Sequence, residues 1–117
     1  MSTISYNGRT FRSTANTANG EVSAATTFTY HQIDQVVWAE YSGGSIVRGH
    51  LIAMLRPDNG LDARYHHINT SGEVMTGKCN TVPEVLEDGR LRLHETWEWT
   101  SGDCSKGKSL VEEDKKE

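Results

Sequence analysis

The sequence predicts an all-β fold in which a single antiparallel meander closes into a barrel of about eight or more strands. Turn sequences such as Asn7-Gly8, Asn19-Gly20 and Ser71-Gly72 recur along the 117 residues. Such pairs favour the tight turns of β-hairpins, because Asn and Gly accept positive φ angles. Between the turns, apolar and polar residues alternate with a period of two, which is typical of strands. A two-sheet β-sandwich is the alternative.

Closure is favoured because a long meander leaves two unpaired edge strands, which can pair with other chains and aggregate. The chain has only two prolines with which to block such edges, whereas a closed barrel has no edges. A chain of this length supports one core. We therefore expect one barrel domain over residues 1–117, with a flexible charged tail at about 112–117.

The elements follow from the pattern in chain order. After an N-terminal strand, the small and polar stretch "RSTANTANGEVSAATT" (12–27) predicts a crossing loop. Alternation then predicts strands, and "TVPEVLED" (81–88) permits one helical turn, since proline suits a first helical position. No longer helix is predicted. The predicted strands of the meander are residues 36–42, 46–55, 62–70, 73–81 and 90–100.

Period-two alternation also predicts which side chains point inward. Trp38, Arg48 and His50 fall on outer faces. The inward positions are Tyr30, Val37, Ala39, Tyr41, Val47, Gly49, Leu51, Ala53, Leu55, Tyr65, His67, Met75, Gly77, Cys79, Leu91, Leu93, Glu95, Trp97 and Trp99.

An interior of this kind suits a ligand pocket, because such pockets are commonly aromatic walls with a few polar groups. An eight-stranded barrel is about wide enough to be filled by side chains or to hold one small ligand. A buried Glu95 would need hydrogen-bond partners, so the sequence leaves open whether it faces a pocket or closes a filled core. The candidate ligand-binding residues are Tyr41, Tyr65, His67, Glu95, Trp97 and Trp99.

Charge and hydropathy exclude several classes of partner. The net charge of −4, with basic residues scattered singly, gives no reason to expect nucleic acid as a partner. No stretch approaches the roughly 18 apolar residues of a membrane span, so no membrane partner is expected. "MSTISYNGRT" lacks the features of a signal peptide, which predicts a cytoplasmic location with Cys79 and Cys104 as free thiols.

The stretch "GDCSKGKS" (102–109) matches the phosphate-binding pattern G-x-x-x-x-G-K-[ST]. That loop works when a strand delivers it to the N-terminus of a helix. Only eight residues follow Ser109, and the preceding region is antiparallel in character. We interpret the match as coincidental, and no nucleotide or other cofactor is predicted.

Histidines do not predict a metal site either. "HETWE" (94–98) ends in Glu where the zinc-protease pattern needs a second His, and it alternates as a strand rather than a helix. His66 and His67 are adjacent in a strand and point to opposite faces. His50, His66 and His94 could share an outer face, but an exposed histidine row is usually only surface. No catalytic residue is assigned.

Three stretches resemble a family of small bacterial proteins: "YNGRTF" (6–11), "YSGGSIVRGHLI" (41–52) and "DARYHHINTSGEVMTGKCNTVPEVLEDGRLRLHETWEWTSGD" (62–103). Some of its members carry the label N-acetylglutamate synthase, which implies acetyl transfer from acetyl-CoA to glutamate. No stretch of this sequence fits the R/Q-x-x-G-x-G/A loop that usually holds acetyl-CoA, so an enzyme is disfavoured. By analogy of fold, the barrel resembles calycin-like barrels of the lipocalin and avidin kind, which bind small molecules in their mouths.

Three hypotheses follow. The first is a small barrel that binds a small molecule in its aromatic interior. The second is an enzyme, either with His67 and Glu95 as an acid–base pair or with the acetyl transfer that the label implies. The third is an interaction protein with a filled barrel, in which Trp38 and its outer-face neighbours form a homodimer or larger homo-oligomer.

Overall fold

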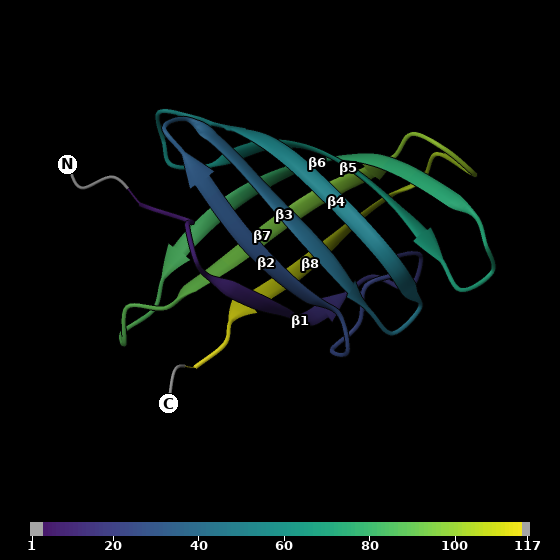
Figure 1. Ribbon diagram of the computed structural model, residues 1–117, viewed down its shortest axis with the longest axis horizontal. Helices are drawn as coiled ribbons and strands as arrows, with labels where there is room; N and C mark the ends of the chain where they lie inside the picture. The colour runs from purple at the N-terminus through teal and green to yellow at the C-terminus, as the bar shows by residue number, and fades with distance from the viewer. Residues whose placement is uncertain (1–3, 116–117) are drawn as a thin grey trace.

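The computed structural model describes residues 4–115, and in this range the chain forms eight strands and no helix (Figure 1). The strands form one closed antiparallel barrel in sequence order, which confirms the predicted fold class and excludes the sandwich. Accordingly, no helix in residues 4–115 is long and apolar enough to cross a membrane. The strands are β1 (Thr10–Asn16), β2 (Thr27–Ile33), β3 (Val36–Gly43), β4 (Ile46–Leu55), β5 (Leu61–Asn69), β6 (Val74–Val85), β7 (Leu91–Trp99) and β8 (Lys106–Glu113).

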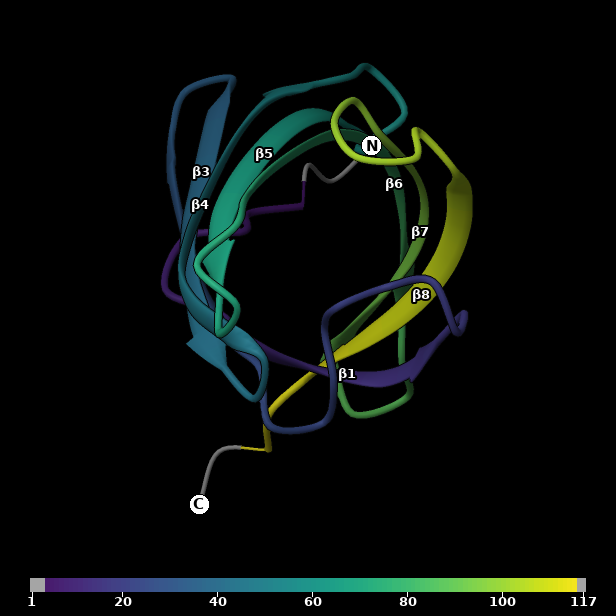
Figure 2. The same cartoon turned by 90° about the vertical axis from the view of Figure 1, so that its right-hand side faces the viewer.

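The barrel closes where β1 pairs with β8, from Phe11 opposite Glu113 to Asn16 opposite Ser109. In an up-and-down meander, successive turns alternate between the two ends of the barrel. One end, here called the loop end, carries residues 17–26, 44–45, 70–73 and 100–105. The loop 17–26 crosses this end in the view along the barrel (Figure 2). The other end, here called the base, carries the remaining turns and residues 4–9, which precede β1.

The base is filled by apolar side chains. Tyr6, from the segment before β1, is completely buried, and its hydroxyl donates to the carbonyl of Asn59 over 2.6 Å. The rings of Phe11 and Tyr30 meet edge to face with centroids 5.1 Å apart. Because this end is packed, any space for a ligand lies nearer the loop end. Other side chains of this core are Val37, Leu61, Leu91, Leu93 and Val111.

Two local predictions are wrong at strand ends. Residues 12–16 belong to β1 rather than to the crossing loop, because β8 supplies partners for Ser13, Ala15 and Asn16 across a bulge. Residues 81–85 continue β6 instead of forming a helical turn, and Pro83 lies opposite Leu93. In both cases an available neighbouring strand outweighs a weak local signal.

One interior position is also wrong. Ile46 is 2% exposed and Val47 is 58% exposed, the reverse of the prediction. A register shift between Ile46 and Arg48 in the pairing of β4 with β5 marks a bulge. A bulge inserts one residue and so reverses the alternation on its far side. From Gly49 onward the predicted face of β4 is the inner one.

The C-terminal strand β8 includes two residues that were expected to belong to the flexible tail. Glu112 and Glu113 belong to β8, and Glu113 is only 6% exposed. Its Oε1 accepts hydrogen bonds from Arg9 and from the backbone N–H of Leu91. Of the expected tail, Asp114 and Lys115 lie beyond β8, and residues 116–117 lie outside the described part of the chain.

Candidate functional site

A cavity of about 60 Å³ lies inside the barrel between the packed base and the loop end. A cavity needs a volume on the order of 10–15 Å³ to hold one water molecule, so this cavity has room for a few groups of that size. All six candidate residues from the sequence line it, together with other aromatic side chains such as Phe28 and Tyr30. The interior therefore contains open space as well as a filled base. The six are Tyr41, Tyr65, His67, Glu95, Trp97 and Trp99.

Aromatic rings form the walls and meet at steep angles. The centroids of Tyr65 and Trp99 lie 5.7 Å apart with their planes at 70°. Trp97 and Trp99 lie 5.4 Å apart at 59°. On the opposite wall, Phe28 stacks on Tyr41 at 4.8 Å. Pairs of rings at steep angles stabilise each other. Because their planes differ in direction, the rings line the cavity from several sides.

Three glycines determine where these rings lie. The strand register places Tyr41 opposite Gly49, Tyr65 opposite Gly77 and Trp97 opposite Gly107. At each glycine, an added Cβ would collide with the ring opposite. Each ring therefore rests directly on the backbone of the neighbouring strand, and only glycine permits that approach.

Glu95 lies on the inner face of β7 between Leu93, in the filled base, and Trp97. Its Oε1 accepts a hydrogen bond from the hydroxyl of Ser109 over 2.8 Å, and within residues 4–115 no side chain or backbone group hydrogen-bonds Oε2. The residue keeps some accessible surface, while protein surrounds its carboxyl group, and it is one of the residues that line the cavity. This burial raises the pKa of Glu95 to about 7, against a smaller opposing effect of the Ser109 hydrogen bond.

Neighbouring groups in the cavity have raised pKa values as well. Burial raises the pKa of the Cys79 thiol and of the Tyr30 hydroxyl, and the charge of Glu95 adds to both shifts. These groups are therefore neutral at physiological pH. Glu95 is the group in this part of the cavity whose charge changes near neutrality.

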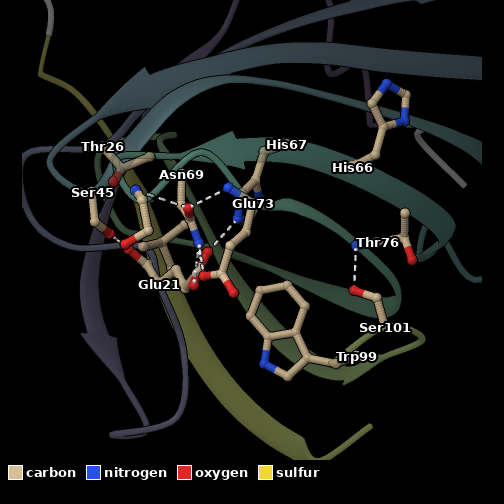
Figure 3. A network of polar contacts seen from close by, with 12 residues as sticks. Glu21, Thr26, Ser45, His66, His67, Asn69, Glu73, Thr76, Trp99 and Ser101 are labelled. Carbon is tan, nitrogen blue, oxygen red and sulfur yellow. Dashed lines mark hydrogen bonds and ion pairs between the residues drawn. The ribbon is translucent and has the colours of Figure 1, made fainter. Parts of the chain in front are cut away.

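His67 connects the cavity to the loop end. The Tyr41 hydroxyl lies 2.9 Å from His67 Nδ1, and His67 Nε2 lies 2.7 Å from Glu21 Oε1. Figure 3 shows Glu21 reaching from the loop 17–26 toward the inner face of β5. The imidazole is thus held at both nitrogens, one by a wall residue and one by the loop.

Asn69 completes this network. Its side-chain amide donates to Glu21 Oε2 and to Glu73 Oε1, each over 3.0 Å. Its Oδ1 accepts from the backbone N–H groups of Ser71 and Glu73, and Ser45 donates to the backbone carbonyl of Glu21. Loop 17–26 is thereby tied to the turns 44–45 and 70–73 across the end of the barrel (Figure 3).

Sequence analysis missed Glu21, Asn16 and Asn69. Asn16 lines the cavity at the end of β1, and its amide donates to the carbonyl of Val22, while its buried Oδ1 has no hydrogen-bond partner within the described chain. Glu21 lies in a small, polar loop without periodicity, so no pattern points to it. Asn69 precedes a turn, where Asn is common for local reasons.

Both residues of the hypothetical acid–base pair, His67 and Glu95, line the cavity, whereas the phosphate-binding pattern at 102–109 lacks, in the described chain, the helix that such a loop needs. His67 contacts Tyr41 and Glu21, and Glu95 contacts Ser109, so the two do not hydrogen-bond each other. Residues 102–109 form the β7–β8 turn and the start of β8, with no helix following in the described chain. Within residues 4–115, no group of three or more His, Cys, Asp or Glu residues is arranged to hold a metal ion.

The fold and the cavity together define a class of protein, the small up-and-down barrels that enclose a cavity near one end. The chain belongs to the avidin-like family: the family model described as avidin-like protein matches residues 4–114. No curated protein and no solved structure gives a significant match. The membership supports the calycin-type resemblance, whereas the N-acetylglutamate synthase label has no support from these comparisons.

Proposed function

We propose that this protein binds a small organic molecule in the cavity of its barrel. The observation that carries the proposal is a carboxyl group, Glu95, with one oxygen free of protein partners inside an aromatic-walled cavity. Enclosure by protein raises the pKa of this carboxyl group, because its charged form lacks the solvation of bulk water, and a ligand that hydrogen-bonds the free oxygen would offset that cost. Membership of the avidin-like family agrees with a binding role.

The ligand would enter at the loop end, because the base is filled by the Tyr6 and Phe11 core. Glu21 and Val22 of the loop 17–26 line the cavity on that side. Bound there, the flat or apolar part of a ligand would contact Trp97 and Trp99, and its polar part would reach Glu95. A cytoplasmic location stays a prediction from the sequence.

Tryptophan fluorescence tests the proposal, because two of the three tryptophans line the cavity and Trp38 lies on the outside. We expect members of a fragment library to quench or shift the emission and to raise the melting temperature of the protein. The Trp38→Phe variant should keep the response, and the Trp97→Phe/Trp99→Phe double variant should lose it. A library in which no compound changes either signal would reject a binding role for the cavity.

A second role, self-association, is favoured by an apolar patch on the outer faces of β2, β3 and β4. Ile33, Ile52 and Met54 are each more than half exposed. The register places Val36 opposite Met54 and Trp38 opposite Ile52, so these side chains are contiguous. Contiguous exposed apolar surface of this kind commonly marks an interface.

The occupant we propose for this patch is a second copy of the chain. Its borders carry both signs of charge, with Glu40 beside His31 on one side and the Asp62–Arg64 pair on the other. A two-fold axis can bring opposite charges of two copies together. Sedimentation at micromolar concentration should show a dimer that Ile52→Lys dissociates and Val85→Lys, an exposed residue elsewhere, does not. A monomer at all concentrations would exclude this role.

A further inference from the structure

The ionisable groups that line the cavity are unbalanced in charge. In the described chain, no lysine or arginine lines it, whereas two carboxyl groups, Glu21 and Glu95, do. Glu21 is already paired with His67 and Asn69 at the loop end. Glu95 has only the neutral hydroxyl of Ser109. A positive partner for Glu95 is therefore missing inside the barrel, and a carboxylate enclosed without one is unfavourable.

The walls around Glu95 are suited to a positive charge. Trp97 and Trp99 follow Glu95 on the same face of β7 at successive inward positions, and Tyr65 meets Trp99 edge to face from β5. The electron-rich faces of such rings attract a cation within about 6 Å of the ring centroid. Rings at steep angles to one another can contact one compact cation from several sides.

A second acceptor lies two strands away from this carboxyl across the sheet, with Ser109 between them. The register places Asn16 of β1 opposite Ser109 of β8, and Ser109 opposite Glu95 of β7. The buried Oδ1 of Asn16 has no partner among residues 4–115. This oxygen adds a second negative partial charge on the same side of the barrel as Glu95, and the absence of basic residues disfavours an anion.

From this arrangement we propose that the ligand is a small organic cation, an ammonium ion held by the Glu95 carboxylate and by the faces of Tyr65, Trp97 and Trp99. The inference rests on the proposed binding function and specifies its ligand class. The small volume of the cavity limits the enclosed head group to a few non-hydrogen atoms, the size of a methylated ammonium group.

The experiment compares three probes of nearly the same shape and different charge. They are choline, its neutral carbon isostere 3,3-dimethyl-1-butanol, and the anion 3,3-dimethylbutanoate, each titrated into the full chain with tryptophan fluorescence and calorimetry. We expect choline to bind at least about tenfold more tightly than the neutral isostere. The anion should bind most weakly.

Glu95→Gln provides the structural test, because it removes the charge and keeps the shape of the side chain. In this variant we expect choline to lose its advantage, so that choline and the neutral isostere bind within about threefold of each other. Glu98→Gln, the same change on the outer face of β7, should leave the advantage intact. Circular dichroism would establish that both variants keep the barrel.

The pH dependence of the wild-type chain keeps the inference testable if Glu95→Gln fails to fold. Choline should bind more tightly as Glu95 ionises between about pH 6 and pH 8 and should release a proton, while the neutral isostere should show neither effect. The other titratable groups facing the cavity are Tyr30, Tyr41, Tyr65, Cys79 and the His67–Glu21 pair. Because the neutral isostere has nearly the same shape as choline, its affinity reports any change in those groups that alters the shape of the cavity.

The outcomes separate the two proposals. If the neutral isostere or the anion binds as tightly as choline or more tightly, the ligand is not a cation, and the binding function stands. If choline keeps its advantage in Glu95→Gln, the charge is recognised elsewhere and the assignment to Glu95 is wrong. If none of the three binds while other fragments do, the cation inference alone fails.

Discussion

Nε2 of His67 lies 2.7 Å from Oε1 of Glu21, which joins two residues 46 positions apart in the chain. His67 is buried in β5, and Glu21 belongs to the loop 17–26 at the end of the barrel. The pair therefore couples the inner wall of the cavity to the segment that covers it. Any ligand that displaces this loop would have to break or rearrange the contact.

The first prediction concerns this coupling. Glu21→Ala should increase amide hydrogen exchange in residues 18–23 and lower the free energy of unfolding by about 1–3 kcal/mol, because His67 loses a partner while buried. The exposed pair of His31 and Glu40 is the control, and Glu40→Ala should cost at most about 1 kcal/mol. Unchanged exchange in the loop of Glu21→Ala would show that other contacts hold it.

The second prediction is a pH dependence of stability caused by Glu95. Its pKa in the folded protein is raised from the ordinary value of 4.5 to about 7, so the folded state binds the proton more tightly than the unfolded chain. Stability from this group is full below about pH 4.5 and falls as pH rises through 7, by about 3 kcal/mol in total.

Urea unfolding at several pH values from 4.5 to 8 measures this loss. In Glu95→Gln the difference in unfolding free energy between pH 4.5 and pH 8 should be smaller than in the wild type by that amount. Other groups contribute equally to both proteins, so the comparison isolates Glu95. Glu98→Gln should follow the wild-type curve, and parallel curves for wild type and Glu95→Gln would contradict the prediction.

The third prediction concerns the glycine beneath Tyr65. Gly77→Ala should push the tyrosine ring away from the strand, destabilising the protein by about 1–3 kcal/mol through overpacking and changing the near-ultraviolet circular dichroism of the cavity rings. Lys78→Ala, on the outer face of the same strand, should change neither quantity. An alanine tolerated at position 77 without loss would mean that the ring can shift at no cost.

The fourth prediction concerns closure of the barrel at its base. Glu113 accepts from Arg9 over 2.7 Å and from the backbone of Leu91 over 3.0 Å, and so joins the last strand to β7 and to the residue that precedes β1. Glu113→Ala should lower the free energy of unfolding by about 3 kcal/mol. This is the lower end of the range for breaking a buried ion pair, because Arg9 keeps access to water. Asp114→Ala, which removes the exposed pair with Arg12, should have little effect in the same denaturation experiment.

Much of the fold could be predicted because alternation and turn residues act locally. The inner face of β7, from Leu91 to Trp99, follows the alternation without a break. Where a bulge interrupts it, as at Val47, the sequence alone gives the wrong face, because the extra residue is a property of the pairing with β5. The ends of β1 and β6 were missed for a similar reason, since their partner strands extend them.

The candidate site likewise contains residues that could be predicted from the sequence and residues that could not. The wall residues could be predicted, because each occupies an inward strand position. The contacts of Glu21 and Asn16 could not, because they arise from a loop that folds back over the barrel end. Nothing in the local sequence of residues 17–26 indicates that its one carboxylate meets a histidine of β5.

The glycine–ring pairs have a consequence for how the cavity could be reshaped. Gly49, Gly77 and Gly107 each support one ring, in three different strand pairings around the wall. Since every ring rests on main chain, replacing it with a smaller side chain would widen the chamber locally while the strands stay in place. The backbone of the barrel would thus keep its course while the shape of the cavity is changed separately at each of the three ring positions.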